Sequence, residues 1–205
     1  MALLLARAVA PFGIAVPATA EALAAGMPPL RADEEDAQAA ARVWDALALS
    51  GGARPVVALH PGSGGAAKRW PPERFVELAR RLITRGCRPL LIEGPADAEV
   101  TAAVLAALGA ETERVRVARG LSVGALTALL RCAAYVGNDS GVSHLAALAG
   151  VPTLALFGPS DPALWAPLGP RVRVLRAPEG DLAWLEAGDV WKMLDSMLLS
   201  LHPMP

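Results

Sequence analysis

The stretch AYVGNDSGVSHLAALAGVPTLALF, from Ala134 to Phe157, contains the pattern that decides the fold. A short apolar run ends at Gly137, a short helical segment follows as far as Gly150, and Val151 begins a second apolar run. Parallel strands need a crossover connection, and an α-helix is the usual crossover. The stretch therefore predicts one strand–helix–strand unit.

The same alternation continues on both sides of this unit. Apolar runs at 55–59, 89–92 and 115–118 are each followed by a helical segment, and a weaker run at 171–175 precedes a C-terminal helix. Short strands that alternate with amphipathic helices indicate a mostly parallel sheet with helices on both faces. We therefore expect an α/β fold, a doubly wound and mostly parallel sheet with N- and C-terminal helical extensions.

The length limits the domain organisation. A chain of 205 residues suffices for one domain with a helical appendage and is a tight fit for two lobes. We expect residues 1–52 to form an N-terminal helical extension, including a helix over 33–50 with an acidic first turn and glycines after it. Residues 53–205 are expected to form the main domain with its terminal helix. The apolar opening lacks a basic segment and is interrupted by proline and glycine, so neither a signal peptide nor a membrane span is expected.

Composition excludes several classes of function. A hydrophobic content of 54% with 19% charged residues excludes a largely disordered chain. A formal net charge of −1 and the lack of a basic stripe argue against nucleic-acid binding. Cys87 and Cys132 lie in apolar segments and far from other ligand types, which predicts buried thiols rather than a zinc site. Any anion site must therefore be built locally.

Two loops concentrate glycine and polar residues. HPGSGGAAKRWP runs from His60 to Pro71 after the first predicted strand, and GNDSGVSH runs from Gly137 to His144 after the fourth. In the usual strand order 3-2-1-4-5-6 these two strands are neighbours, and their carboxyl ends flank the switch point at which ligands bind. We therefore expect both loops to face one crevice.

The chemistry of both loops suits a diphosphate. The glycines around Gly64 let the backbone approach a ligand, and Lys68 supplies a positive charge beside them. Asp139-Ser140-Gly141 opens a helix whose first N–H groups are unpaired and whose dipole favours an anion. His144, about one turn into that helix, can donate a ring N–H or carry a proton.

Two better-known phosphate motifs do not fit. A Walker loop needs glycine before its lysine and serine or threonine after it, whereas Lys68 lies between Ala67 and Arg69. The strict dinucleotide fingerprint fails because Ala67 stands three residues after Gly64; the looser form that ends in alanine fits, but the helix is predicted to open only at Pro72. Nucleotide hydrolysis and nicotinamide binding are therefore disfavoured.

Taken together, the motifs resemble those of glycosyltransferase family 9, the heptosyltransferase-like enzymes. HPGSGGAAKRWP, EGPAD at 93–97, GLS at 120–122 and the segment from Gly137 to Pro162 occur in the family's order and spacing, followed by Trp165 and Pro167. The resemblance implies one Rossmann-like lobe of a GT-B fold that binds an ADP-heptose-type nucleotide sugar. It also implies transfer with inversion to a lipopolysaccharide core or other glycan acceptor.

The resemblance also assigns the donor-binding residues. Carried over position by position, it implies Ser63, Gly64 and Lys68 at the phosphates, Asp97 near the nucleoside, and Asp139, Ser140, Gly141 and His144 around the sugar and diphosphate. We expect no cofactor and no metal, because the lysine, the glycine loop and the helix start offset the charge of the leaving diphosphate.

The N-terminal side departs from the family pattern. A full member has an acceptor lobe before this one, and the resemblance implies that a carboxylate there deprotonates the acceptor hydroxyl. Only about fifty residues precede the present domain, too few for a parallel-sheet lobe. We therefore expect the catalytic base to be missing and transfer by the chain alone to be weak or absent, unless a partner chain supplies the other lobe. A cytoplasmic location with at most a peripheral membrane contact is expected.

Simpler interpretations exist for several of these residues. Asp97 and Asp139 could each merely cap the helix that follows. Lys68 could be a solvated loop charge, and His144 a core or rim histidine. Trp70 is expected to staple its loop to the next helix rather than to stack on a base.

Two other classes of function remain as alternatives. Asp139, Ser140 and His144 are the residue types of a serine hydrolase, but GNDSG places the serine one position late for a nucleophile elbow, and Ser140 lies too close to His144 on one helix. A serine-directed phosphonate is expected not to label the chain. A non-catalytic nucleotide-sugar-binding protein, or a subunit of a split transferase, is the other alternative.

Overall fold

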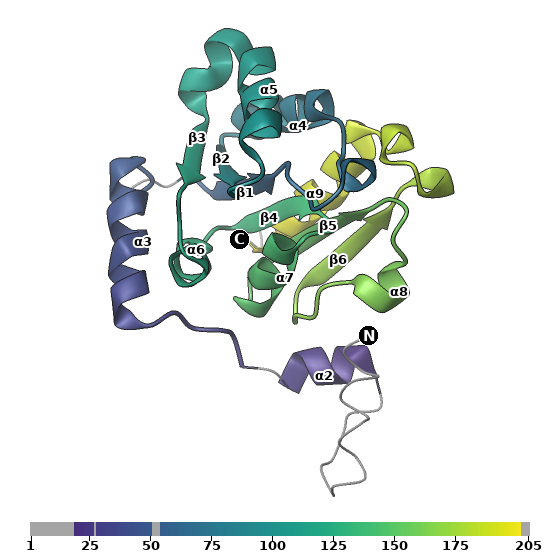
Figure 1. Cartoon of the computed structure of the whole chain (residues 1–205), viewed down its shortest axis with the longest axis horizontal. Coiled ribbons are helices and arrows are strands. Elements are labelled where there is room, and N and C mark those ends of the chain that lie inside the picture. The colour runs from purple at the N-terminus through teal and green to yellow at the C-terminus, as the bar shows by residue number, and fades with distance from the viewer. Residues whose placement is uncertain (1–18, 27, 51–53, 202–205) are drawn as a thin grey trace, which may run out of the picture.

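The computed structural model describes residues 19–26, 28–50 and 54–201, and its strands form a single parallel sheet (Figure 1). The strands are β1 (Val56–His60), β2 (Arg88–Glu93), β3 (Arg116–Arg119), β4 (Ala134–Asn138), β5 (Thr153–Phe157) and β6 (Val172–Arg176). Their order is β3-β2-β1-β4-β5-β6. This confirms the predicted doubly wound α/β fold and places β1 beside β4.

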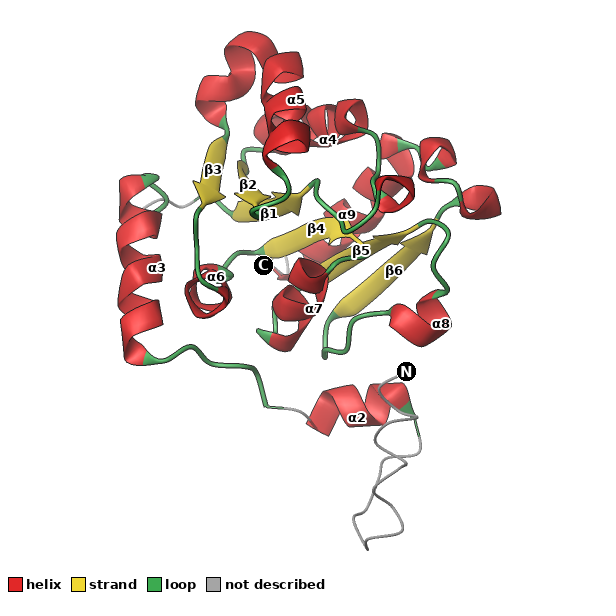
Figure 2. Cartoon of the chain, in the orientation of Figure 1, coloured by secondary structure: helices red, strands yellow, loops and turns green. Residues whose placement is uncertain are grey.

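Helices cover both faces of the sheet (Figure 2). The described helices are α2 (Ala20–Gly26), α3 (Glu34–Ala46), α4 (Pro72–Thr84), α5 (Ala98–Leu108), α6 (Val123–Leu129), α7 (Gly141–Leu148), α8 (Pro162–Trp165) and α9 (Ala187–Leu201), of which α2 lies apart from the sheet (Figure 2). Short 3-10 helices occupy Ala66–Lys68, Gly109–Arg114, Pro178–Gly180 and Leu182–Trp184. The helices α4 to α8 therefore take the crossover positions that a parallel sheet requires, whereas α2 and α3 precede β1 and α9 follows β6.

Alternate residues of the strands divide between two hydrophobic cores. Val57 and Leu59 belong to the core under α4, α5 and α9, whereas Val56 and Ala58 belong to the core that includes residues of α3, α6 and α7. Every residue of β1, β4 and β5 is buried. Burial on both faces explains why these strands read as continuous apolar runs rather than as alternating ones.

The helix α3 belongs to the second of these cores. Ala40 is fully buried there, and Asp36 accepts a hydrogen bond of 2.7 Å from the Ser122 hydroxyl at the start of α6. The helix ends at Ala46, earlier than the predicted 33–50, because Ala48 adopts a positive φ of 52° that breaks the helical path. The glycines predicted to stop it, and the proposed boundary at residue 52, lie outside the described residues. Within the described residues, no helix has both the length and the apolar character needed to cross a bilayer.

Candidate functional site

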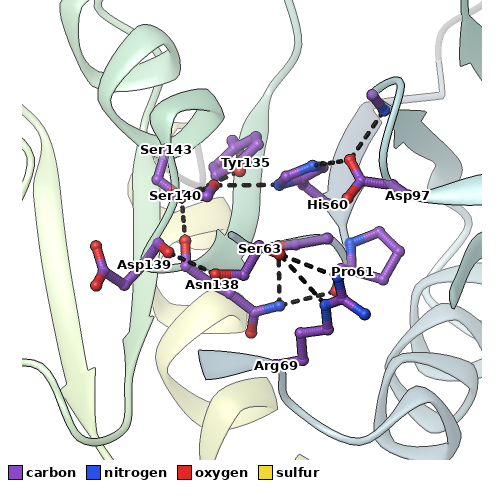
Figure 3. A network of polar contacts seen from close by, with 12 residues as sticks. His60, Pro61, Ser63, Arg69, Asp97, Tyr135, Asn138, Asp139, Ser140 and Ser143 are labelled. Atoms are coloured by element: carbon purple, nitrogen blue, oxygen red, sulfur yellow. Dashed lines mark hydrogen bonds and ion pairs between the residues drawn. The ribbon is translucent and has the colours of Figure 1, made fainter. Parts of the chain in front are cut away.

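The loops after β1 and β4 lie side by side at the carboxyl edge of the sheet (Figure 3). The hydroxyl of Ser63 donates a hydrogen bond of 2.9 Å to the backbone carbonyl of Asp139. Across the same gap, Lys68 Nζ lies 2.8 Å from Asp139 Oδ2. The predicted convergence of the two loops is confirmed.

The side-chain amide of Asn138, the last residue of β4, joins the two loops. Its Nδ2 donates to the carbonyls of Pro61 at 2.9 Å and Gly62 at 3.2 Å, and its Oδ1 accepts from the Trp70 N–H at 3.0 Å. The residue is fully buried, so these bonds replace those that water would make. Asn138 was not among the predicted site residues, because an asparagine in a strand carries no sign of which distant backbone it will meet.

Arg69 and Trp70 hold the first loop in shape. The Arg69 guanidinium donates to the Ser63 carbonyl at 3.3 and 3.2 Å, so it does more than sit in solvent as a loop charge. Trp70 is fully buried, donates its indole N–H to the Leu185 carbonyl at 2.8 Å, and meets the Phe75 ring edge-on at 4.9 Å. The predicted role of Trp70 as a staple to the following helix is confirmed.

Asp97 reaches the site from a third loop, between β2 and α5. Its Oδ2 accepts from the Gly94 N–H at 3.0 Å and lies 3.0 Å from His60 Nε2. A Cβ on residue 62 would overlap this carboxylate, which explains the glycine at that position. The hydrogen bond from His60 is the main cause that lowers the pKa of Asp97 below 3.8, with smaller contributions from Gly94 and the charge of Arg69. Asp97 occupies the N-cap position of α5, as the capping interpretation expects, but its side chain makes no cap bond to that helix.

His60, at the end of β1, connects Asp97 to Ser140. The residue is 2% exposed, and Nδ1 lies 3.2 Å from the Ser140 hydroxyl (Figure 3). A line of polar contacts therefore runs from one loop through the ring to the N-cap of α7. His60 was not among the predicted site residues, although its place at the head of the glycine loop, on a switch-point strand, was a usable signal.

These residues border a cavity of about 470 Å³, a size common among small-molecule sites. Among the predicted donor residues, those that line it are Ser63, Gly64, Asp97, Ser140 and Gly141, together with His60. The rest of the lining is mostly apolar and consists of Gly94, Pro95, Ala96, Val123, Leu126, Val142 and Leu145. The cavity thus has a polar end formed by the loops and an apolar side formed by α6 and α7.

The other predicted residues lie beside the cavity. Lys68 keeps 41% of its side chain exposed next to the Asp139 carboxylate, which is 9% exposed. The N-cap of α7 is Ser140, without a side-chain cap bond, so capping is not the role of Asp139. His144 is partly buried in α7, and burial lowers its pKa despite the opposing charge of Asp139. In the hydrolase set, Ser140 contacts His60 rather than His144, and Asp139 pairs with Lys68.

A family profile identifies the chain. The profile of "Glycosyltransferase family 9 (heptosyltransferase)" matches residues 8–194. The chain belongs to glycosyltransferase family 9. This membership counts against the serine-hydrolase alternative.

Curated relatives of this family 9 chain carry heptosyltransferase names. Lipooligosaccharide heptosyltransferase 2 of Haemophilus influenzae is 35% identical over 156 residues, which are 74% of this chain and 45% of that protein. Lipopolysaccharide heptosyltransferase 2 of Escherichia coli is 39% identical over 129 residues, which are 60% of this chain and 36% of that protein. The chain spans less than half the length of these relatives.

Solved structures of family 9 share the fold. The E. coli "ADP-heptose lps heptosyltransferase II" is 34% identical with a TM-score of 0.74, and the match covers 84% of this chain and 54% of that one. The family 9 glycosyltransferase of Veillonella parvula is 27% identical with a TM-score of 0.76, and the match covers 85% and 54%. The described sheet therefore corresponds to about one lobe of these GT-B enzymes.

Proposed function

We propose that this chain binds an ADP-heptose-type nucleotide sugar and forms the donor half of an inverting glycosyltransferase. Its proposed acceptor is a lipopolysaccharide core or a related glycan. The observation that carries the proposal is the meeting of two glycine-bearing loops and a helix start at one cavity on the switch point of the sheet, with a lysine beside it. The E. coli relative at 34% identity, named for ADP-heptose, supports this choice of donor.

The polar end of the cavity suits the diphosphate. Ser63, Gly64 and Gly141 line it, and the dipole of α7 favours an anion at its start by about 0.3–1 kcal/mol. The Lys68 side chain is exposed enough to rotate from Asp139 towards a phosphate oxygen while the backbone of its loop stays in place. These groups would carry the charge of the leaving diphosphate, so we propose that no metal is required; calorimetry in the presence of EDTA tests this, and loss of binding would contradict it.

The apolar side of the cavity suits the nucleoside. Val123, Leu126 and Leu145 present apolar surface against which a flat base can pack. Near them, Asp97 uses Oδ2 for its contacts with His60 and Gly94, which leaves Oδ1 for a ribose hydroxyl. This division assigns Asp97 to the nucleoside and the two loops to the diphosphate.

For the acceptor side, we propose that a second lobe supplies the carboxylate that deprotonates the acceptor hydroxyl. A separate partner chain is one source of such a lobe. Adding the purified chain to donor and acceptor, with and without a candidate partner, tests this: turnover only with the partner supports it, and robust turnover without one contradicts it.

Calorimetric titration of ADP-heptose into the purified chain tests donor binding. We expect Lys68→Ala to weaken binding by about tenfold, equivalent to about 1.4 kcal/mol, because the cation beside the diphosphate is lost. Lys192→Ala is the matched control, since Lys192 is 79% exposed on α9 and pairs with Asp189 in the same helix. Equal affinities of Lys68→Ala and the unchanged chain would contradict the assignment.

A further inference from the structure

Both ring nitrogens of His60 are occupied by residues that border the cavity. Nε2 lies 3.0 Å from Asp97 Oδ2, and Nδ1 lies 3.2 Å from Ser140 Oγ. The ring is almost completely buried, so water does not compete freely for either nitrogen. The state of this ring therefore determines how the two cavity residues present their polar atoms (Figure 3).

The Asp97 carboxylate determines which ring nitrogen of His60 carries a hydrogen in both protonation states. Its carboxylate form is favoured, because contact with His60 lowers its pKa. A carboxylate only accepts hydrogen bonds, so the Nε2 of His60 must donate to it. The remaining variable is Nδ1, which accepts when the ring is neutral and donates when the ring carries a second proton.

Ser140 has one hydroxyl hydrogen, and Nδ1 decides where it goes. When Nδ1 accepts, the Ser140 hydrogen points at His60 and a ligand meets only oxygen lone pairs. When Nδ1 donates, the same hydrogen is free for an acceptor in the cavity. Ser143 offers little alternative, because its oxygen is 3.5 Å away, its own hydrogen goes to the Asn138 carbonyl at 2.5 Å, and it already contacts Tyr135 at 3.1 Å. The Tyr135 hydroxyl also contacts Ser140, and as a neutral phenol it can donate its own hydrogen there.

Charged and titratable groups lie on every element around His60. They are Asp97 before α5, Glu93 at the end of β2 with Arg119 on β3, Tyr135 on β4 with Cys132 before it, Arg69 after β1, the Lys68–Asp139 pair between the loops, and His144 on α7. Burial raises the pKa of Tyr135, and that of Cys132 to about 12, so both stay neutral near pH 7. Two phosphate charges arriving beside Ser140 would add negative potential near the ring and favour its protonated form.

We propose, resting on the proposed function, that His60 is a positioning residue that takes up a proton from solvent when a nucleoside diphosphate binds. The imidazolium donates from Nε2 to Asp97 and from Nδ1 to Ser140, and Ser140 then donates its hydrogen to a phosphate oxygen. In this role the histidine acts on the phosphate through Ser140. It converts Ser140 from an acceptor into a donor and ties the nucleoside end of the site to the diphosphate end.

Calorimetry of ADP-ribose binding in buffers of different ionisation enthalpy tests the proposal. Both phosphates of ADP-ribose are esterified, so the probe lacks the terminal phosphate of ADP, whose second pKa of about 6 would contribute protons of its own. We expect net uptake of protons on binding, seen as a measured heat that varies with the ionisation enthalpy of the buffer. We also expect the affinity of the unchanged chain to fall as the pH rises from 6.5 to 8.5, which needs no variant.

Three variants separate this role from a structural one. His60→Asn cannot take up the proton, so we expect affinity about threefold to tenfold lower and heats that no longer depend on the buffer. Ser140→Ala keeps the ring but removes the hydroxyl that links it to the phosphate, and proton uptake should fall. His144→Asn is the matched control, because His144 bonds to Ser140 only through its backbone N–H, which the substitution keeps, and proton uptake should persist whatever its affinity.

The outcomes distinguish this proposal from the proposed function. Binding of ADP-ribose without proton uptake, or uptake that persists in His60→Asn, overturns the role of His60 and leaves donor binding intact. Uptake that disappears in His144→Asn but not in His60→Asn shows that His144 takes up the proton, and this result also overturns the role of His60. Absence of binding of both ADP-ribose and ADP-heptose to the unchanged chain overturns both proposals.

Discussion

At the scale of single residues, Gly62 gives the clearest steric test. A side chain there would overlap the Asp97 carboxylate, whereas nothing lies within 4 Å of a Cβ added at Gly65. We expect Gly62→Ala to lower the free energy of unfolding by about 1–3 kcal/mol, as overpacking usually does. Gly65→Ala, in extended backbone with φ −156°, should be neutral or slightly stabilising. Urea denaturation of both variants checks this, and equal stabilities would show that Asp97 does not occupy this position.

The buried carboxylate of Asp97 predicts a specific dependence of stability on pH. Its pKa is lowered in the fold, mainly by His60, so its contribution is present above its ordinary pKa of 3.8 and is lost as the pH falls through the folded value. The difference in Tm between the unchanged chain and Asp97→Asn should therefore shrink below about pH 4. Asp189→Asn, which removes a carboxylate in an exposed pair, should show little difference at any pH. A difference for Asp97→Asn that grows on acidification would contradict the account.

The sequence predicted those site residues whose role follows from their neighbours in the chain, and it missed those whose role follows from contacts with distant residues. Ser63, Lys68 and Ser140 stood out because glycine, a cation and a helix start occur together in short loops. His60 and Asn138 were missed because their importance arises from partners 37 to 80 positions away along the chain. Nothing in their own neighbourhoods specifies those partners.

At the scale of elements, α6 and α7 provide the apolar side of the cavity. Val123 lines it and is 72% exposed, so replacing it should change stability by no more than about 0.5 kcal/mol. We expect Val123→Ser to weaken binding of ADP-heptose by about threefold to tenfold, because apolar contact with the base is lost. Leu199→Ser, at an exposed apolar position on α9, should leave the affinity unchanged. Calorimetry measures the affinity of both variants. An affinity of Val123→Ser equal to that of the unchanged chain would show that the nucleoside does not bind against α6.

Element positions followed from the sequence where backbone signals are strong. Ser122 caps α6 through its side chain, and Gly86, Gly109 and Gly150 adopt the positive φ that ends the helices before them. The end of α3 was wrong because Ala48, a residue that rarely takes positive φ, does so here. The helix α8 and the 3-10 turn at Ala66–Lys68 were also missed, because three or four residues are too few for a periodic pattern.

At the scale of the whole molecule, strand order does the most to create the site. The order β3-β2-β1-β4-β5-β6 brings the ends of β1 and β4 together, and general rules for parallel sheets were enough to predict it. The packing of α3 against α6 could not be predicted, because a helix pattern specifies an apolar stripe without naming its partner. The division of the chain at residue 52 stays a prediction.

Hydrogen–deuterium exchange with and without ADP-heptose tests the central claim most directly, because it reports on both loops in one measurement. If the two loops form one diphosphate site, ligand should slow exchange in 60–71 and 137–144 together, and Lys68→Ala should reduce both effects at a fixed ligand concentration. The groove between α4 and α9, lined by Arg80, Arg81 and Trp191, should exchange unchanged. Protection confined to one loop, or located in that groove, would contradict the account.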